Sequence, residues 1–181
     1  MTPRRTPAPV DGARRRWARA ALALACGGAV GQALAQVGAA APPAKGDLVR
    51  WPEVRLLDGR PLAAPAQRAQ AAVLVFFSTT CPFCMRHNQH VQKLAAASAG
   101  LPLQVLGVAL DRRADEVRQY LARRGLAFDV TLDERALRSV LSPRRVIPLT
   151  CVLDREGRLR EVIPGEMFED DVLGLVKWAR V

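Results

Sequence analysis

The segment from Val73 to Cys84 reads Val-Leu-Val-Phe-Phe-Ser-Thr-Thr-Cys-Pro-Phe-Cys. Its first five residues are apolar and mostly β-branched or aromatic, which is typical of a strand buried on both faces. Three small polar residues then turn the chain. Pro82 follows Cys81, and proline is well placed in the first turn of a helix. The segment therefore predicts a buried strand that delivers Cys81 to the N-terminus of a helix.

The two cysteines of this segment have the spacing of a redox pair. A helix N-terminus favours negative charge, and the thiolate is the reactive form of cysteine. Cys84 lies about one helical turn beyond Cys81, close enough for a disulfide between them. A Cys-x-x-Cys pair also forms half of a zinc site, but the sequence holds no second pair. We favour the redox interpretation over zinc binding and over cysteines that are only buried.

The first 35 residues have the pattern of a secretory signal peptide. Arginines precede an Ala/Leu-rich run that ends in Ala33-Leu34-Ala35, a small-x-small cleavage pattern. We expect cleavage after Ala35 and export to the periplasm. An uncleaved signal or a lipidated Cys26 would instead tether the protein to the membrane. The arginines at 14–16 loosely resemble a twin-arginine signal, although a general secretory signal is favoured.

Removal of this signal changes the charge balance. The whole chain has a formal net charge of +10. Six of its 27 Lys/Arg residues and one of its 17 Asp/Glu residues lie in the first 35, so residues 36–181 carry +5. These charges are scattered, as on solvated helix faces, and we expect no nucleic-acid partner. Residues 36–50 are rich in Ala, Gly and Pro and predict a linker, which leaves one domain at 51–181.

Strand and helix patterns alternate along this domain. The expected elements are a hairpin at 54–62, strands at 73–77, 103–110, 128–132, 146–153 and 159–163, and helices at 81–97, 112–124, 134–141 and 166–181. In the last helix, Phe168 and Val172 are expected on the buried face. This order predicts an α/β domain with a mixed central sheet flanked by helices.

Pro148 stands inside the apolar run 146–153. Proline removes a hydrogen bond from a sheet, so it belongs at an edge or at a special site. Spacing alone favours a trans proline at the start of a strand, and the alternative is a cis bond after Ile147. Cys151, three residues further on, is expected to pack in the core as a small hydrophobic residue.

Taken together, these features resemble the thioredoxin superfamily, and within it the exported thiol–disulfide oxidoreductases of the TlpA/ResA/cytochrome-c-maturation type. The resemblance covers about residues 50–181 and includes the opening hairpin, the Cys-x-x-Cys segment, the inserted helix and strand at 112–132, and Ile147-Pro148-Leu149-Thr150. It implies a thioredoxin-like fold with an N-terminal hairpin and a central helix–strand insertion. It also implies that Pro148 is cis beside the cysteines, and that the Ile147 backbone pairs with substrate as an added strand.

Several residues depart from the pattern of that family. Thr80 stands where Trp usually precedes the first cysteine, and Val75 where a buried acid or amide is common. Val75 cannot relay a proton, so a water molecule or a nearby residue must. His87 and His90 stand at helix positions that are often Glu. His87, one turn beyond Cys84, would favour the thiolate if it were protonated, although an exposed and inert histidine is the simpler expectation.

The resulting hypothesis is a disulfide reductase for protein substrates. The Cys81 thiolate attacks, Cys84 resolves the mixed disulfide, and Phe83 and Ile147 form an apolar lip for the substrate. Because no cation stands between the cysteines, only the helix N-terminus stabilises the thiolate. This predicts a reducing couple, which a membrane electron donor must restore. The cycle needs no cofactor and no metal, and we expect a monomer.

Two other functions fit parts of the sequence. A peroxiredoxin-like thiol peroxidase shares the fold and needs Ser or Thr three residues before its cysteine, as Ser78 is here, but Leu74 replaces the usual proline. A copper-binding or copper-delivery module would use the two cysteines together with His87 and His90. Residues three apart drift around a helix with about 3.6 residues per turn, so four such ligands cannot converge on one ion.

Overall fold

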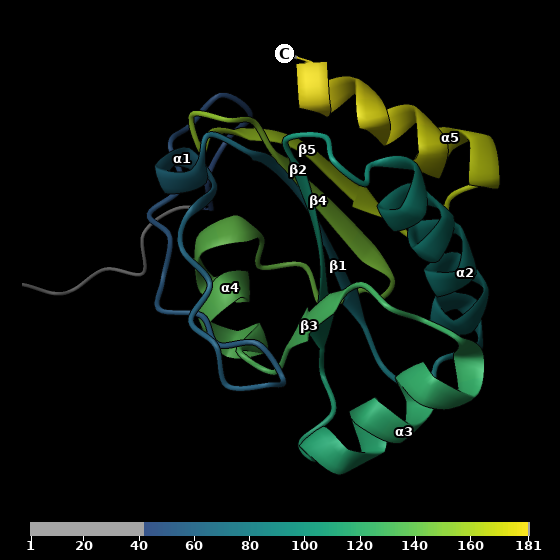
Figure 1. Ribbon diagram of the computed structural model, residues 1–181. Coiled ribbons are helices and arrows are strands. Elements are labelled where there is room, and N and C mark those ends of the chain that lie inside the picture. Colours follow the sequence, from purple (N-terminus) through teal and green to yellow (C-terminus); the bar gives the residue numbers. More distant parts are fainter. Residues whose placement is uncertain (1–41, 181) are drawn as a thin grey trace, which may run out of the picture. The chain divides into compact units, whose positions relative to one another are not determined.

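A computed structural model describes residues 42–180 (Figure 1). The predicted signal peptide, Cys26 and the start of the predicted linker lie outside these residues. The elements in chain order are α1 (Pro65–Arg68), β1 (Ala71–Phe77), α2 (Pro82–Ala97), β2 (Leu103–Ala109), α3 (Ala114–Arg124), β3 (Asp129–Thr131), α4 (Glu134–Leu141), β4 (Leu149–Leu153), β5 (Leu159–Pro164), α5 (Glu169–Gly174) and the 3₁₀-helix η1 (Leu175–Arg180). Within 42–180, none of the helices has the length and hydrophobicity needed to cross a membrane.

β1 is the central strand of a five-stranded mixed sheet with the order β3-β2-β1-β4-β5. It runs parallel to β2, and β2 runs parallel to β3. β4 is antiparallel to both of its neighbours, β1 and β5. All residues of β1 are buried, as its apolar run predicted. The C-terminal ends of β1 and β2 and the start of β4 therefore lie at one edge of the sheet.

Side chains alternate between the two faces of β1, and each face has its own hydrophobic core. Val73, Val75 and Phe77 pack with α2, α3, α5 and η1. Leu74 and Phe76 belong to the other core, together with α4. Figure 1 shows α2 and α5 on one side of the sheet and α4 on the other. Each fully buried large apolar side chain contributes about 1.5–3 kcal/mol. The predicted mixed sheet flanked by helices is confirmed, and it has the thioredoxin-like architecture.

Gly107 in β2 permits close packing beside the end of β1. A Cβ atom at this position would lie 2.9 Å from Phe128 Cε2 and 3.0 Å from both Phe77 Cε1 and Val130 Cγ2. Real Cβ contacts are longer than this, so a larger residue would push Phe77 away. Because Phe77 is the last residue of β1, its position also fixes the start of the turn that leads to Cys81.

The N-terminal part of the domain confirms the predicted hairpin but not the predicted end of the linker. Residues 54–62 form a short hairpin with an antiparallel bridge between Arg55 and Pro61, and the Leu62 N–H donates to the Val54 carbonyl oxygen at 2.8 Å. The predicted linker ends too late: the Gly46 N–H donates to the Leu159 carbonyl oxygen at 2.7 Å, and Val49 is buried. The packed domain thus begins before residue 51.

The predicted helix at 166–181 begins later than expected and changes type. Residues 165–167 first turn the chain onto α2, where the Met167 N–H donates to His87 Nδ1, and α5 starts only afterwards. Phe168 precedes α5 in an extended conformation and is 82% exposed, so its expected burial was wrong. Val172 is buried as expected. After Gly174 the chain continues as the 3₁₀-helix η1.

Candidate active site

Cys81 caps the N-terminus of α2, where the sequence placed it. Its backbone is extended, Pro82 occupies the first turn, and the backbone N–H of Cys84 donates to Cys81 Sγ at 3.3 Å. Such a hydrogen bond favours the thiolate because a charged acceptor binds a donor more strongly than a neutral one. Cys81 is partly exposed, whereas Cys84 is fully buried. Only Cys81 is therefore open to a substrate.

Asp111 holds the turn that precedes Cys81. The Thr79 backbone N–H and hydroxyl donate to the Asp111 carboxylate at 3.0 and 2.6 Å. Asp111 follows β2, which is the parallel neighbour of β1, so both segments leave the sheet at the same edge. The sequence analysis missed this residue. One signal in the sequence could have identified it: Asp111 directly follows a buried strand, and that strand ends at the same edge of the sheet as the strand before Cys81.

The environments of Cys84 and Cys151, the other cysteines within residues 42–180, disfavour their thiolates. Burial, and to a smaller extent the hydrogen bond with Cys81, raises the pKa of Cys84 to about 12. Burial also raises the pKa of Cys151 to about 12. Cys151 lies opposite Leu74 in the core on the α4 side of the sheet. Its predicted role as a small buried hydrophobic residue is confirmed.

The Ile147–Pro148 peptide bond is cis, as the resemblance implied. The antiparallel register of β1 and β4 pairs Phe76 with Leu149, so Pro148 comes next to the end of β1. With the described residues, the backbone of Ile147 makes no hydrogen bond. The neighbouring surface is apolar, because Phe83 is 56% and Val146 is 43% exposed. The structure thus brings the residues of the predicted lip to the edge that carries Cys81.

His87 is not the exposed helix histidine that the sequence favoured. It is fully buried, and burial lowers its pKa from 6.5 to about 4, with a smaller effect from nearby His90. Its Nδ1 accepts the Met167 N–H at 3.3 Å, and Nε2 lies 3.2 Å from Thr150 Oγ1. The ring is therefore neutral near pH 7 and fastens α2 to β4 and to the turn before α5. The expectation that a protonated His87 modulates the thiolate is corrected, because burial keeps the ring uncharged.

A buried polar pair on the same side of α2 was not predicted. Asn88 lies four residues beyond Cys84, hence on the same helix face, and is fully buried. Its Nδ2 donates to the Tyr120 hydroxyl at 3.1 Å, which links α2 to α3. Asn88 Oδ1 has no hydrogen-bond partner among residues 42–180. Burial raises the pKa of Tyr120, so its hydroxyl stays protonated at neutral pH.

Arg86 supplies a cation near Cys81 that the sequence analysis overlooked. Its Nε and Nη2 donate to the Glu166 carboxylate at 2.8 and 2.6 Å, and its guanidinium lies 5.0 Å from the centroid of the Phe83 ring. The hydrogen bond to Glu166 is the main cause that raises the pKa of Arg86, and the charge of Cys81 adds to it. The helix N-terminus is thus not the only positive group near Cys81.

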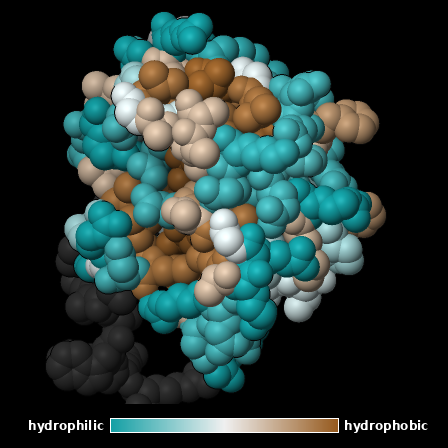
Figure 2. All heavy atoms as spheres, turned by 45° about the vertical axis from the view of Figure 1, so that its right-hand side comes forward, coloured by the Kyte–Doolittle hydropathy of each residue, from teal (hydrophilic) through white to brown (hydrophobic). Residues whose placement is uncertain are grey.

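Figure 2 shows hydrophobic areas separated by wide hydrophilic ones on the side where α2 and α5 lie.

The candidate metal ligands do not converge. Among residues 42–180, no three His, Cys, Asp or Glu side chains gather in a way that could hold a metal ion. His87 points toward Thr150, whereas His90 Nδ1 lies 3.3 Å from the Met167 carbonyl oxygen. Each histidine thus has its own partners within the fold.

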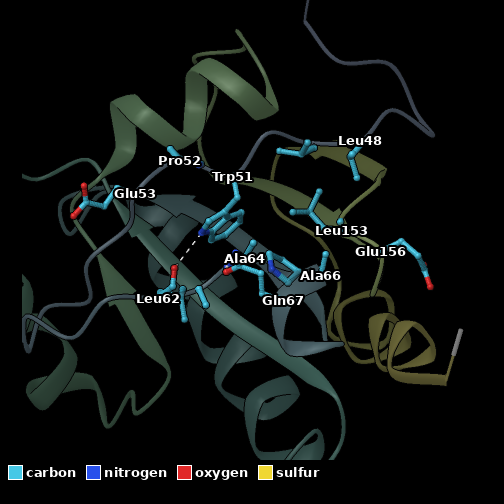
Figure 3. Close-up of a pocket in the computed structure, with 14 residues that line it drawn as sticks. Leu48, Trp51, Pro52, Glu53, Leu62, Ala64, Ala66, Gln67, Leu153 and Glu156 are labelled. Atoms are coloured by element: carbon cyan, nitrogen blue, oxygen red, sulfur yellow. Dashed lines mark hydrogen bonds between the residues drawn. The ribbon is translucent and has the colours of Figure 1, made fainter.

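A cavity of about 440 Å³ lies away from the cysteines. Figure 3 shows the labelled side chains around it, with the Trp51 indole N–H donating to the Leu62 carbonyl oxygen at 3.1 Å. It is lined by residues of the N-terminal segment, of α1 and of the end of β4 at Leu153. None of the residues near Cys81 lines it, so we do not assign it to the redox site.

Comparison with known proteins identifies the family. Residues 37–162 match the AhpC/TSA family. The chain belongs to that family. Curated relatives include thiol-disulfide oxidoreductase ResA of Geobacillus thermodenitrificans, 25% identical over 118 residues, which are 64% of this chain and 67% of the relative. ResA of Geobacillus kaustophilus is 25% identical over 107 residues, 58% of this chain and 60% of that protein. The alignments therefore span about two thirds of these relatives or less.

Solved structures support the thioredoxin-like fold. A thiol:disulfide interchange protein of the thioredoxin family from Chlorobium tepidum has a TM-score of 0.61 at 24% identity, covering 76% of this chain and 95% of that one. A secreted disulfide oxidoreductase of Mycobacterium tuberculosis has a TM-score of 0.58 at 20% identity, covering 69% and 93%. At these identities the likeness establishes the fold, and the activity has to be argued from the site.

Proposed function

We propose that this protein is an exported thiol–disulfide oxidoreductase that reduces disulfides in protein substrates. The contrast between the two cysteines carries the proposal. Cys81 is partly exposed at a helix N-terminus, while Cys84 is buried one turn behind it with its pKa raised to about 12. One cysteine is thus open to a partner, and the other is shielded until the first has reacted. The ResA relatives, which are named thiol-disulfide oxidoreductases, support the thiol–disulfide chemistry but say nothing of its direction.

In the proposed cycle one disulfide is broken in the substrate and one is formed between Cys81 and Cys84. The Cys81 thiolate attacks one sulfur of the substrate disulfide, forms a mixed disulfide and expels the other sulfur as a thiolate. The thiolate of Cys84 then attacks Cys81 Sγ, which closes the Cys81–Cys84 disulfide and releases the second substrate thiolate. Two electrons have passed to the substrate. An external dithiol, supplied by a membrane electron donor in our proposal, must reduce the protein again.

The direction of the reaction depends on how strongly the thiolate form is favoured. Known couples run from about −120 mV for the most oxidising to about −270 mV for thioredoxin. No histidine stands between the cysteines, and Glu166 pairs with Arg86, which reduces the positive field on Cys81. We place the couple in the reducing half of this range. Equilibration against glutathione, with the ratio of oxidised to reduced protein read by mass shift, tests this; a potential near the oxidising end would mean that the protein makes disulfides.

The substrate segment is proposed to add as a strand beside Ile147. The backbone groups of Ile147 make no hydrogen bond with the described residues, and this residue precedes the cis proline. An extended segment can pair with such groups, while the exposed Phe83 ring covers its apolar side chains. Protein disulfides on flexible or unfolded segments fit this geometry, because a folded partner seldom presents an unpaired strand.

The decisive experiment compares single cysteine variants on a protein disulfide such as that of insulin. The unsubstituted protein, reduced beforehand, should reduce it, and Cys81→Ser should not. Cys84→Ser should accumulate a mixed disulfide between Cys81 and the substrate, and it should trap the physiological partner in cells. Cys151→Ser is the matched control, because Cys151 lies on the far side of the sheet. Equal activity of all three variants would contradict the proposal.

Export rests on the sequence pattern of residues 1–35, and one structural relative is described as secreted. The cleavage site is proposed after Ala35, so the mature chain should begin at Gln36. Sequencing the N-terminus of protein recovered from the exported fraction checks this. An intact Met1 or a lipid on Cys26 would instead indicate a tethered form.

A thiol peroxidase remains the rival function on this fold. Such an enzyme needs a hydroxyl that assists its cysteine, but Ser78 Oγ lies 3.1 Å from Thr80 Oγ1 and 3.4 Å from Asp111 Oδ1. This hydroxyl is therefore engaged in the turn. Turnover of hydrogen peroxide by Cys84→Ser at the rate of the unsubstituted protein would favour the peroxidase.

A further inference from the structure

Two arginines without a salt bridge in the described residues directly precede Val146 and Ile147, and Ile147 is the residue proposed to pair with the substrate. Arg144 and Arg145 lie in the loop between α4 and β4, and both are exposed. Within residues 42–180 neither makes a salt bridge, whereas Arg86 near Cys81 is paired with Glu166. The next residues are the exposed Val146 and the cis Ile147–Pro148 pair. Positive charge is thus built into the segment that meets the substrate.

The fold holds the backbone of this loop in place. The guanidinium of Arg138 lies 4.6 Å from the centroid of the buried Phe76 ring and donates to the Arg144 carbonyl oxygen. The Arg144 N–H donates to Ser142 Oγ at 3.3 Å. Because the main chain is fixed at both of these points, the side chains of Arg144 and Arg145 project from a defined position and do not sweep freely around the molecule.

The sheet register brings the loop alongside the turn before Cys81. β1 and β4 pair up to Phe76 and Leu149, so the loop that ends at Pro148 lies at the end of β1 from which the turn to Cys81 leaves the sheet, and Ile147 and Cys81 pack against the same core. The acidic side chains at this edge are already engaged: Asp111 accepts hydrogen bonds from Thr79, and Glu166 pairs with Arg86. No nearby carboxylate therefore cancels the positive field of the two arginines. This field acts on a substrate segment bound beside residues 144–147, which we call the docking edge.

We propose that this protein prefers substrates in which acidic residues flank the disulfide. The proposal rests on the proposed reductase function and names the class of substrate that it favours. A segment paired beside Ile147 would carry its neighbouring side chains past Arg144 and Arg145, where Asp or Glu gains attraction and Lys or Arg meets repulsion. Each exposed ion pair changes binding severalfold at most, so two cations give a preference of about threefold to tenfold.

Two synthetic peptides test this preference. Both contain one internal disulfide and the same uncharged residues, and they differ only in carrying two Glu or two Lys beside one cysteine. At low salt, reduced protein should reduce the acidic peptide about threefold to tenfold faster in kcat/KM, with the difference in KM. High salt screens exposed charges, so the preference should shrink at an ionic strength of about 1 M. The double variant R144Q/R145Q should reduce the two peptides at equal rates.

The control variant R50Q/R180Q removes the same charge elsewhere. Arg50 and Arg180 are exposed, make no salt bridge in the described residues, and lie before α1 and at the end of η1. This variant should keep the preference. Reduction of the neutral hydroxyethyl disulfide should be equal in R50Q/R180Q and in the unsubstituted protein, which shows that the control substitutions leave Cys81 unaltered.

The outcomes separate the two proposals. If neither peptide is reduced, the reductase function fails. If both are reduced at the same rate and without dependence on salt, the function stands and the acidic preference is overturned. The preference is also overturned if R50Q/R180Q removes it as fully as R144Q/R145Q, because the effect then comes from total charge and not from the docking edge.

Discussion

The buried His87 makes the stability of this protein depend on pH in a defined window. Its pKa falls from 6.5 to about 4 when it is buried in the fold. The unfolded chain therefore binds a proton more readily than the folded one, and lowering the pH favours unfolding. The contribution is fully present above pH 6.5 and is lost as the pH approaches about 4. The ring is fully buried, so solvent screening does not reduce the effect.

The size of the effect follows from the two pKa values. A shift of one unit corresponds to about 1.4 kcal/mol, so the free energy of unfolding should fall by about 2 kcal/mol between pH 7 and pH 5, and by about 3 kcal/mol at pH 4. The cause is specific: a protonated Nδ1 can no longer accept the Met167 N–H, and the charge is buried. The carboxylates of Glu166 and Glu169 have lowered pKa values, so they add their own loss only below about pH 4.5.

Urea unfolding of the reduced protein at several pH values measures this dependence. His87→Gln keeps a donor and an acceptor but cannot titrate, so its stability should be nearly flat from pH 7 to pH 5. His90→Gln is the matched control and should retain most of the slope, because the His90 side chain is only partly buried, at 24% exposure. A flat profile in the unsubstituted protein would refute the reasoning. An NMR titration in which the His87 ring protonates near pH 6.5 would refute it independently of any variant.

Other predictions concern the cysteines and their supports. Alkylation of the reduced protein below pH 7 should modify Cys81 first, and Cys84 and Cys151 last, because burial raises the pKa of both buried thiols to about 12. Mass spectrometry of a time course measures this order, and equal labelling of the three cysteines would contradict it. Resolution of the mixed disulfide, followed by quenched flow, should speed up about tenfold per pH unit between pH 7 and 9, since few Cys84 thiols are ionised there. Asp111→Asn should lower the free energy of unfolding by about 1–2 kcal/mol and slow the attack by Cys81, as measured by urea titration and stopped flow. Gly107→Ala should destabilise the fold by about 1–3 kcal/mol through overpacking, and unchanged thermal unfolding would argue against the close contact.

Periodicity and turn residues were sufficient to predict most of the fold. The buried strand β1, the helix capped by Cys81 and the helix Glu134–Leu141 were all expected from the sequence, because their signals are local. Phe168 was misplaced because its burial depends on where the chain turns after β5. That turn is set by a contact with His87, a residue 80 positions earlier, which no local pattern encodes.

The polar partners of the site were the part that sequence could not supply. Asp111 was missed because its role arises from strand adjacency, 32 residues away from Thr79. Tyr120 was not expected at the site, because its bond to Asn88 requires α3 to pack on α2. Arg86 was not predicted because it lies beyond the Cys-x-x-Cys segment, whereas a helix also brings its next turn near that segment.

These polar groups bear on the one step for which the sequence offered no proton acceptor. Cys84 must lose its proton before it can resolve the mixed disulfide, and Val75 in β1 is apolar and fully buried. Neither Asn88 nor Tyr120, the polar pair on the same side of α2, is a base near neutral pH. The buried thiol of Cys84 therefore stays protonated near neutral pH, with its pKa raised to about 12. The attack by Cys81 is then the fast step and resolution the slow one, so the mixed disulfide persists long enough for the docking edge to select among substrates.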